Sequence, residues 1–323
     1  MESRDFVSIR DLSPEEMEYL LFLGRQIKAH PSVYRQALSG KTLALIFEKP
    51  SLRTRVSFDV GIHQLGGFSL YLSPTEINLG KRESIHDVAK NLERMVQAIV
   101  MRTFAHETVE EMAACCDIPV INGLTDFSHP CQAMADYLTI SEVKGRVRNV
   151  KLAFVGDGNN VAHSLLFGGA QLGADVRIAS PPGYEPRPQA IAWARKRASQ
   201  THGKVTVTND PREAVAGADI VYTDVWTSMG QETEAQERLQ VFRPYQVNSK
   251  LFAHAKPDAV FMHCLPAHRG EEVTADVIDS ARSLVFQQAE NRLHVQKAIL
   301  IELMEHVPLE AMRPAEALEL VAA

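Results

Sequence analysis

The stretch Phe47-Glu48-Lys49-Pro50-Ser51-Leu52-Arg53-Thr54-Arg55 decides the fold prediction, because it joins a short apolar run to a helix-like pattern. The run 42–47 is β-prone and has the length of a buried strand, whereas 53–65 carries apolar residues at helical spacing. Ser51 falls near the helix N-cap, where unpaired backbone N–H groups and the helix dipole favour an anion. The segment therefore predicts a phosphate-binding turn, with an ordinary capped helix and solvated arginines as the alternative.

Short apolar runs alternate with longer helical patterns along the chain. Alternation of this kind predicts parallel strands joined by right-handed helical crossovers. The expected strands are 43–47, 68–72, 98–101, 119–121, 152–155, 175–179, 204–208, 220–222, 259–262 and 284–286. We therefore expect an α/β fold with two doubly wound domains. Each would have a mainly parallel central sheet flanked by helices, with the active site in the cleft between the domains.

A domain boundary is expected near the middle of the chain. At 323 residues the chain exceeds the length at which one hydrophobic core usually keeps growing. A helical pattern ends at about Lys144, and the polar run Gly-Arg-Val-Arg-Asn follows it at 145–149. We expect one domain over 1–144 and a second over 145–289, with the C-terminal helix in 290–323 packing back on the first.

Composition and charge narrow the class of protein. A net charge of −6 argues against a general nucleic-acid binder, whose surface is expected to be basic. No segment is long and apolar enough to span a bilayer, and residues 1–5 lack the apolar run of a signal peptide. We therefore expect a cytoplasmic enzyme without nucleic-acid or membrane partners, in which any anion site is local.

Disulfide and zinc chemistry is not indicated by the cysteine spacing. The four cysteines are Cys115, Cys116, Cys131 and Cys264. They show neither CxxC nor zinc-finger spacing, and Cys264 with His263 and His268 is a poor set for a four-ligand zinc site. We therefore expect reduced thiols and no metal.

Polar residues follow the expected strands at their carboxyl ends, where open α/β sheets bind ligands. In the first half of the chain these residues are Ser51, Arg53, Thr54, Arg102, His129 and Gln132. Positive charge together with neutral donors suits a small phosphorylated substrate that also carries a carbonyl group to be polarised. Imidazole titrates near neutrality, so His129 is the natural electrophile or proton donor, with a helix-capping histidine as the alternative. Gln132 lies one helical turn later and faces the same way.

The second half of the chain supplies the other side of the expected cleft, with different side chains. The loop Gly156–Asn160 bears glycine, but Val161 occupies the third glycine position of a dinucleotide fingerprint and Asp157 would face the pyrophosphate. A contact between the Asn160 amide and a small polar ligand fits at least as well. Asp224 follows another strand, where it could pair with a substrate ammonium group or cap a turn.

Cys264 and His263 are adjacent at the end of an expected strand. Neighbouring residues in a strand point to opposite faces, so a direct proton relay between the two side chains is disfavoured. Cys264 is then either a polar contact in the site or an inert buried thiol.

Taken together, these motifs resemble the aspartate/ornithine carbamoyltransferase family nearly from end to end. Residues 47–55 resemble the family's Ser-Thr-Arg-Thr carbamoyl-phosphate motif, Met-Arg-Thr at 101–103 supplies its second arginine, and His-Pro-Cys-Gln at 129–132 resembles its His-Pro-x-Gln motif. The run Asp-Val-Trp-Thr-Ser-Met-Gly at 224–230 and His-Cys-Leu-Pro at 263–266 resemble the ornithine-type members. Aspartate-type members are expected to carry His-Pro-Leu-Pro at the latter position.

The resemblance implies an activity and a set of site residues. The activity is transfer of the carbamoyl group of carbamoyl phosphate to the δ-amine of L-ornithine, giving L-citrulline and phosphate without a cofactor or metal. The implied assembly is a homotrimer with active sites at subunit interfaces. Carbamoyl phosphate would be bound by Ser51, Leu52, Arg53, Thr54, Asn78, Arg102, His129, Gln132, Cys264, Leu265 and Arg292. Ornithine would be bound by Asn160, Asp224, Ser228 and Met229. The residues implied in catalysis are Arg53, Arg102, His129, Asp224 and Cys264.

Two positions depart from the family pattern. Leu52 stands where the family usually has a threonine, so one hydroxyl is lost while the backbone N–H that a phosphate can use is kept. Asn78 stands in place of a glutamine that reaches a neighbouring subunit's site, and its side chain is one methylene shorter.

Three other functions remain open. A carbamoyltransferase for another amine, such as N-acetylornithine, N-succinylornithine or putrescine, would carry similar motifs. A nicotinamide-dependent oxidoreductase would explain the glycine-bearing loop, but it requires an acidic residue after the next strand, where Ala-Ser-Pro-Pro stands at 179–182. A catalytically silent relative would serve as a binding or assembly subunit. The sequence does not distinguish arginine synthesis from arginine breakdown.

Overall fold

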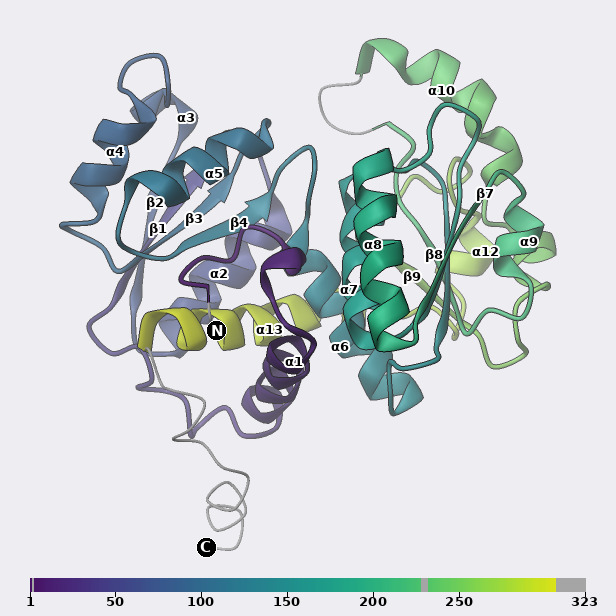
Figure 1. Ribbon diagram of the computed structural model, residues 1–323, viewed down its shortest axis with the longest axis horizontal. Helices are drawn as coiled ribbons and strands as arrows, with labels where there is room; N and C mark the ends of the chain where they lie inside the picture. Colours follow the sequence, from purple (N-terminus) through teal and green to yellow (C-terminus); the bar gives the residue numbers. More distant parts are fainter. Residues whose placement is uncertain (2, 228–231, 306–323) are drawn as a thin grey trace, which may run out of the picture.

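The structure is a computed structural model that describes residues 1, 3–227 and 232–305. Its strands form two parallel sheets, which belong to the two lobes seen in Figure 1. The first sheet has the order β2 (Phe68–Leu72), β1 (Thr42–Phe47), β3 (Ala98–Arg102), β4 (Val120–Leu124). The second has the order β7 (Lys204–Thr208), β6 (Asp175–Ala179), β5 (Lys151–Val155), β8 (Ile220–Thr223), β9 (Val260–His263). The strand pairs of both sheets are parallel, and the expected α/β fold with two doubly wound domains is confirmed.

Helices connect the strands and flank the sheets. Around the first sheet they are η1 (Ile9–Asp11), α1 (Pro14–Ala29), α2 (Leu52–Gln64), α3 (Pro74–Ile77), α4 (Ile85–Leu92) and α5 (His106–Cys115). Between the sheets in sequence lies α6 (Pro130–Lys144). The remaining helices are α7 (Asn160–Leu172), α8 (Pro188–Thr201), α9 (Pro211–Val215), η2 (Glu232–Glu234), α10 (Ala235–Phe242), η3 (Arg243–Tyr245), α11 (Ser249–Phe252), α12 (Ala275–Ile278) and α13 (Val285–Glu305).

The central strands owe their position to their apolar sequences. All five residues of β3 are buried, as expected for a parallel strand that helices cover on both faces, whereas the edge strands β2 and β7 contain no fully buried residue. The carboxyl ends of β1 and β3 lie side by side, because Phe47 pairs with Arg102 in the ladder. This register brings the turn before α2 next to Arg102.

Close helix packing joins the two lobes. Helices α6 and α7 lie between the lobes in Figure 1 and pack against each other. Their contact depends on a glycine, because a Cβ added at Gly168 would lie 2.3 Å from the ring of Tyr137. One core cluster contains residues of both lobes, for example Leu45 and Phe154. The relative position of the two lobes is therefore set by buried side chains.

The end of the described chain differs from the sequence prediction. The expected strand at 284–286 is wrong: Ser283 makes an isolated bridge with Phe261, and α13 begins at Val285. The backbone N–H of Leu284 donates to Phe261 O at 2.9 Å, so the chain touches the sheet edge only briefly before it becomes helical. Three apolar residues in a row do not distinguish these alternatives.

Helix α13 packs against α1, α2 and α6, all of which belong to the first half of the chain. A Cβ added at Gly24 of α1 would lie 3.4 Å from the Cα of Val295, so these two helices approach closely. The division of the chain at 144/145 stays a prediction. Within the described ranges, the helices include none that is long and apolar enough to cross a membrane.

Candidate active site

A cavity of about 930 Å³ opens at the carboxyl ends of strands from both sheets. Hereafter it is called the cleft. From the first half of the chain it is lined by Ser51, Arg53, Arg102 and His129, and α13 contributes Arg292. From the second half it is lined by Asn159, Asn160, Asp224, Cys264 and Leu265, among others. The structure thus brings together residues that lie more than 200 positions apart in the sequence.

The N-terminus of α2 faces the cleft as a preorganised turn. Ser51 is its N-cap, and the Ser51 hydroxyl accepts a hydrogen bond from the Thr54 N–H at 3.2 Å. The Thr54 hydroxyl in turn accepts one from Nη2 of Arg292 at 2.6 Å, so α13 is tied to this turn. Arg53 donates from Nη2 to the carbonyl oxygen of Leu265, which comes from the opposite side of the cleft. The turn is therefore held in place by both halves of the chain.

Positive charge in this wall exceeds the negative charge beside it. Burial, followed by the nearby arginines, lowers the pKa of both Arg102 and Arg292 to about 10, so both remain protonated at neutral pH. Burial likewise lowers the pKa of Arg53. The Nε atoms of Arg102 and Arg292 are buried and have no hydrogen-bond partner among the described residues. Uncompensated buried cations favour an anionic ligand.

His129 is neutral in this surrounding. Burial, and then the charges of Arg292, Arg102 and Arg53, place the imidazole pKa well below its usual value. Its backbone N–H donates to the Ser164 hydroxyl at 2.8 Å, which fixes the start of α6. A neutral imidazole among arginines can donate one hydrogen bond to a carbonyl oxygen.

A buried hydrogen-bond network lies behind this wall and crosses between the lobes. Asp136 Oδ1 accepts from Gln132 Nε2 at 2.8 Å and from Gln288 Nε2 at 2.7 Å, while Oδ2 accepts from the Tyr222 hydroxyl at 3.2 Å. Burial raises the pKa of Asp136 to about 7, against the lowering effect of these hydrogen bonds. Because the Gln132 Nε2 faces Asp136, its Oε1 is turned away and has no partner among the described residues. The network therefore sets the orientation of the Gln132 amide.

The opposite wall is organised around Asp224. Its Oδ1 accepts from the Cys264 thiol at 2.9 Å, and its Oδ2 accepts from Asn159 Nδ2 at 2.8 Å. Burial, followed by the charge of Asp224, raises the pKa of the Cys264 thiol well above its usual value. The thiol is therefore a hydrogen-bond donor rather than a nucleophile. The Val225 N–H also donates to Oδ1 at 2.8 Å, so three donors hold the carboxylate in one orientation.

The glycine-bearing loop before α7 is not arranged for a dinucleotide. A Cβ added at Gly158 would lie 2.2 Å from the backbone nitrogen of Pro186, so the loop is covered by a neighbouring segment. Asp157 pairs with Arg238 at 3.0 Å, although burial raises the pKa of Asp157 to about 6. Asn160 donates to the Thr125 carbonyl at 2.5 Å and lines the cleft, as expected for a contact with a small ligand.

Several expected site residues lie elsewhere or behind the cleft surface. Thr54 and Gln132 are buried behind the lining residues. Leu52 is the first residue of α2, is 73% exposed and does not line the cleft. Asn78 is the exposed C-cap of α3 and adopts a left-handed conformation with φ of 48°, also away from the cleft of its own chain. Ser228 and Met229 lie outside the described residues.

Sequence reasoning missed the residues that support the site from behind. Asn159 orients Asp224, Ser164 holds the backbone of His129, and Asp136 orients Gln132. Asn159 is the N-cap of α7, and an Asn directly before a helical pattern is a recognisable signal for that role. Nothing in the sequence indicates that its free amide hydrogens reach a strand end 65 residues away.

One group of donors near the cleft has the composition of a metal site. Asp224, His263 and Cys264 place one ligand atom each within 4.8 Å of one another. Both ring nitrogens of His263 are already occupied, because Nδ1 lies 2.8 Å from the Leu265 N–H and Nε2 lies 3.2 Å from Glu272 Oε1. The imidazole therefore has no lone pair left for an ion, and the cluster functions as a hydrogen-bonded set.

Comparisons with known proteins agree with this arrangement. Residues 4–142 match the family model for the carbamoyl-P binding domain of aspartate/ornithine carbamoyltransferase, and residues 148–303 match the model for its Asp/Orn binding domain. The chain is 54% identical over 306 residues to a protein of Thermococcus kodakarensis named ornithine carbamoyltransferase, covering 94% of this chain and 97% of the relative. It is 57% identical over 297 residues to the Bacillus subtilis protein of the same name, covering 92% of each.

A solved structure gives the same result for the fold. The ornithine carbamoyltransferase of Pyrococcus furiosus superposes with a TM-score of 0.91 at 53% identity, covering 94% of this chain and 97% of that one. Both family models and the level of identity lead to one conclusion. The chain belongs to the aspartate/ornithine carbamoyltransferase family.

Proposed function

We propose that this protein is an ornithine carbamoyltransferase, which transfers the carbamoyl group of carbamoyl phosphate to the δ-amine of L-ornithine. The observation that carries the proposal is that two differently charged walls face each other across one cleft. The first, cationic wall contains the arginines, and the second, acceptor wall contains the hydrogen-bond acceptor Asp224. The names of the relatives at 53–57% identity support the choice of ornithine as the acceptor amine.

Carbamoyl phosphate would bind to the cationic wall. The N-terminus of α2 with Ser51 and Arg53 suits the phosphate, and Arg102 with Arg292 supplies further charge. His129 would donate to the carbonyl oxygen, where negative charge develops in the transition state. Gln132 Oε1, which has no partner among the described residues, is an acceptor for the carbamoyl N–H.

Ornithine would bind to the acceptor wall. Asp224 accepts an N–H of the substrate amine, and the Cys264 thiol and Asn159 hold its carboxylate in place. Asn160 lines the same side and would contact the polar end of ornithine, together with Ser228 and Met229, which lie outside the described residues. This arrangement directs the lone pair of a neutral δ-amine towards the carbonyl carbon.

The chemical step needs no group beyond the two substrates and these side chains. The δ-nitrogen forms a C–N bond to the carbonyl carbon, giving a tetrahedral intermediate, and the C–O bond to phosphate then breaks. One amine proton leaves with the phosphate, so neutral ornithine amine and the carbamoyl phosphate dianion give citrulline and the hydrogen phosphate dianion. Arg53, Arg102 and His129 would stabilise the charge on the oxyanion and the leaving group.

The proposal extends to the pathway, the assembly and the compartment. The reaction is assigned to arginine biosynthesis, because the Pyrococcus furiosus relative is named anabolic. A homotrimer, in which Asn78 reaches the cleft of a neighbouring subunit, suits the exposed position of Asn78. Four cysteines without a disulfide suit the reducing cytoplasm.

The test is steady-state citrulline formation from carbamoyl phosphate and L-ornithine. N-acetylornithine, N-succinylornithine and putrescine are run as competing acceptors, with carbamoylated product measured for each. We expect ornithine to give the highest kcat/KM, and a higher value with any other amine would overturn the choice of acceptor. If the protein is a homotrimer, light scattering in solution should give a particle mass of three times the mass of one chain.

A further inference from the structure

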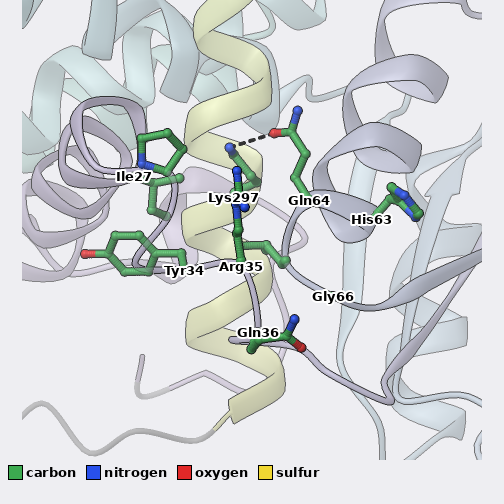
Figure 2. Close-up of a pocket in the computed structure, with 10 residues that line it drawn as sticks. Ile27, Tyr34, Arg35, Gln36, His63, Gln64, Gly66 and Lys297 are labelled. Atoms are coloured by element: carbon green, nitrogen blue, oxygen red, sulfur yellow. Dashed lines mark hydrogen bonds between the residues drawn. The ribbon is translucent and has the colours of Figure 1, made fainter.

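A second cavity of about 390 Å³ lies at the other end of α2 from the cleft. Figure 2 shows it beside the C-terminal half of α13. Its lining comes from the end of α1, the loop that follows α1, the end of α2 and α13. The lining residues that matter for its chemistry are Ile27, Tyr34, Arg35, His63, Leu65 and Lys297.

Two glycines allow this cavity to form. A Cβ added at Gly61 of α2 would lie 3.4 Å from the Cγ of Lys297, so the lysine stem packs closely on the helix. Gly66 has a φ of +88°, and a Cβ there would lie 2.8 Å from the Arg35 carbonyl oxygen. The Leu38 N–H donates to the Leu65 carbonyl at 2.8 Å. The loop and the helix end are thus held against each other.

Lys297 is a buried cation without a carboxylate partner in the described part of the chain. Its side chain donates to the neutral amide oxygen of Gln64 at 2.9 Å, the contact drawn in Figure 2, and the residue is only 2% exposed. Lysine is rarely buried to this degree unless an anion accompanies it, because the desolvation of its charge is costly. Burial lowers its pKa in agreement with that cost. The cavity therefore offers an uncompensated positive charge.

Arg35 is a second cation in the lining of the same cavity, and its side chain has no ion-pair or hydrogen-bond partner within residues 1, 3–227 and 232–305. The His63 ring points away from Lys297 in Figure 2. Tyr34 is half-buried, and in Figure 2 its ring lies near Ile27 while its hydroxyl points away from Lys297. Ile27 and Leu65 are buried and apolar. The cavity combines a cationic end with an apolar wall, which is the composition of a site for a small organic anion.

We propose that this cavity binds a small phosphate monoester at a site separate from the cleft. Lys297 and Arg35 together carry two positive charges, which match the two negative charges of a phosphate ester near neutral pH. The half-buried ring of Tyr34, which also lines the cavity, gives the organic part of the ester an apolar surface. Binding moves the hydrogen bond of Lys297 from Gln64 to the phosphate.

Occupation of this site affects the pairing of α2 with α13. These helices are linked by Lys297 and Gln64 at the cavity and by Arg292 and Thr54 at the cleft. Loss of the first link removes one of the two side-chain hydrogen bonds between the described residues of α13 and of α2, the helix whose N-terminus faces the cleft. This consequence for carbamoyl phosphate rests on the proposed function, whereas the binding itself does not.

Binding is tested by calorimetric titration with phenyl phosphate on an Arg53→Ala background, which removes an arginine of the cleft. In that background we expect one binding event that weakens at least tenfold in Lys297→Met. The control Lys196→Met removes the same charge from an exposed position of α8 and should change the affinity less than twofold. Equal affinity in the two lysine variants, or no binding at all, would overturn the site.

A second variant guards against a folding defect. Arg35 is exposed, so Arg35→Gln should keep the fold and still weaken phenyl phosphate about fivefold. Inorganic phosphate and succinate are the other probes. Inorganic phosphate should bind more weakly than phenyl phosphate because it lacks the organic group. If succinate binds as tightly as phenyl phosphate, the assignment of the site to a phosphate ester is wrong. In citrulline assays, phenyl phosphate should raise the KM for carbamoyl phosphate at least twofold more in the parent protein than in Lys297→Met. An equal rise in both would overturn the link to the cleft.

Discussion

The two walls of the cleft differ in how their charges are compensated. In the first wall burial, and then the charge of Arg53, lowers the pKa of both Arg102 and Arg292, and the buried Nε atoms of these two have no partner among the described residues. In the second wall Asp224 receives hydrogen bonds from Cys264 and Asn159. The first wall is therefore incomplete without an anion, while the second is complete and sets a geometry. Under the proposed function, the first wall would supply binding energy for an anion, and the second would orient the amine.

Replacing Arg53 should produce the largest effect. In Arg53→Ala we expect kcat/KM for citrulline formation to fall at least ~10³-fold, because a charged donor to the reacting group is removed from a site shielded from water. Arg195→Ala, which removes the same charge from the exposed face of α8, should stay within about twofold of the parent. Turnover near the parent level in Arg53→Ala would contradict the role of the first wall.

Removing the charge of Asp224 should have the next largest effect. Asp224→Asn keeps the shape but supplies an N–H where the substrate amine needs an acceptor, so we expect a loss of about 10²-fold in kcat/KM for ornithine. The KM for carbamoyl phosphate should change much less, since we propose that this substrate binds to the first wall. Equal changes in the kinetic constants for ornithine and carbamoyl phosphate would mean that the two substrates do not bind to separate walls.

The network behind the first wall should respond to pH. Asp136→Asn removes the charged acceptor of Gln132, and we expect a loss of about tenfold in kcat/KM. The pKa of Asp136 in the folded protein, about 7, lies above the ordinary aspartate value of 3.8, so folding binds a proton and stability falls as pH rises through this interval. Asp136→Asn has no titratable group at this position and therefore does not lose stability in this way.

Its thermal stability relative to the parent protein should therefore increase between about pH 5 and pH 7 and level off above. Scanning calorimetry across this range checks the trend. The exposed Glu18→Gln is the control, for which no such trend is expected. A constant difference between Asp136→Asn and the parent would mean that Asp136 does not titrate in this window.

Changing Cys264 should have a modest effect. Cys264→Ser keeps a donor to Asp224, so we expect kcat/KM to fall about threefold, within the range of one altered hydrogen bond. Cys264→Ala removes the donor and should cost about tenfold. If both variants lose activity completely, the thiol has a chemical role that its protonated state does not explain.

The smallest effect is expected at Leu52. Its side chain is exposed and lies outside the cleft lining, so only its backbone N–H is available to a phosphate. Leu52→Thr should therefore change the KM for carbamoyl phosphate by about twofold or less. A large gain in affinity would show that a threonine hydroxyl at this position reaches the ligand.

The sequence-based predictions were correct where the interactions join residues close in the sequence, and failed where they join distant residues. The strand, cap and helix at 42–64 were predicted because each depends on neighbouring residues: Ser51 bonds to the N–H three residues later. The expected strand at 284–286 was wrong because a single contact with Phe261, far away in the sequence, decides where the chain leaves the sheet edge. The Asp136 network joins three segments, namely α6, β8 and α13, and no local pattern indicates such a meeting.

The sequence by itself determined the alternation of strands and helices, the Ser51-capped turn before α2 and the family, because periodicity, capping and short motifs are local properties of the chain. Only the tertiary structure decided which charges remain unpaired. Arg292 depends on the packing of α13 against α2, and the protonated thiol of Cys264 depends on its burial beside Asp224. Burial and proximity between distant segments set these charge states, and neither is encoded at any single position of the sequence.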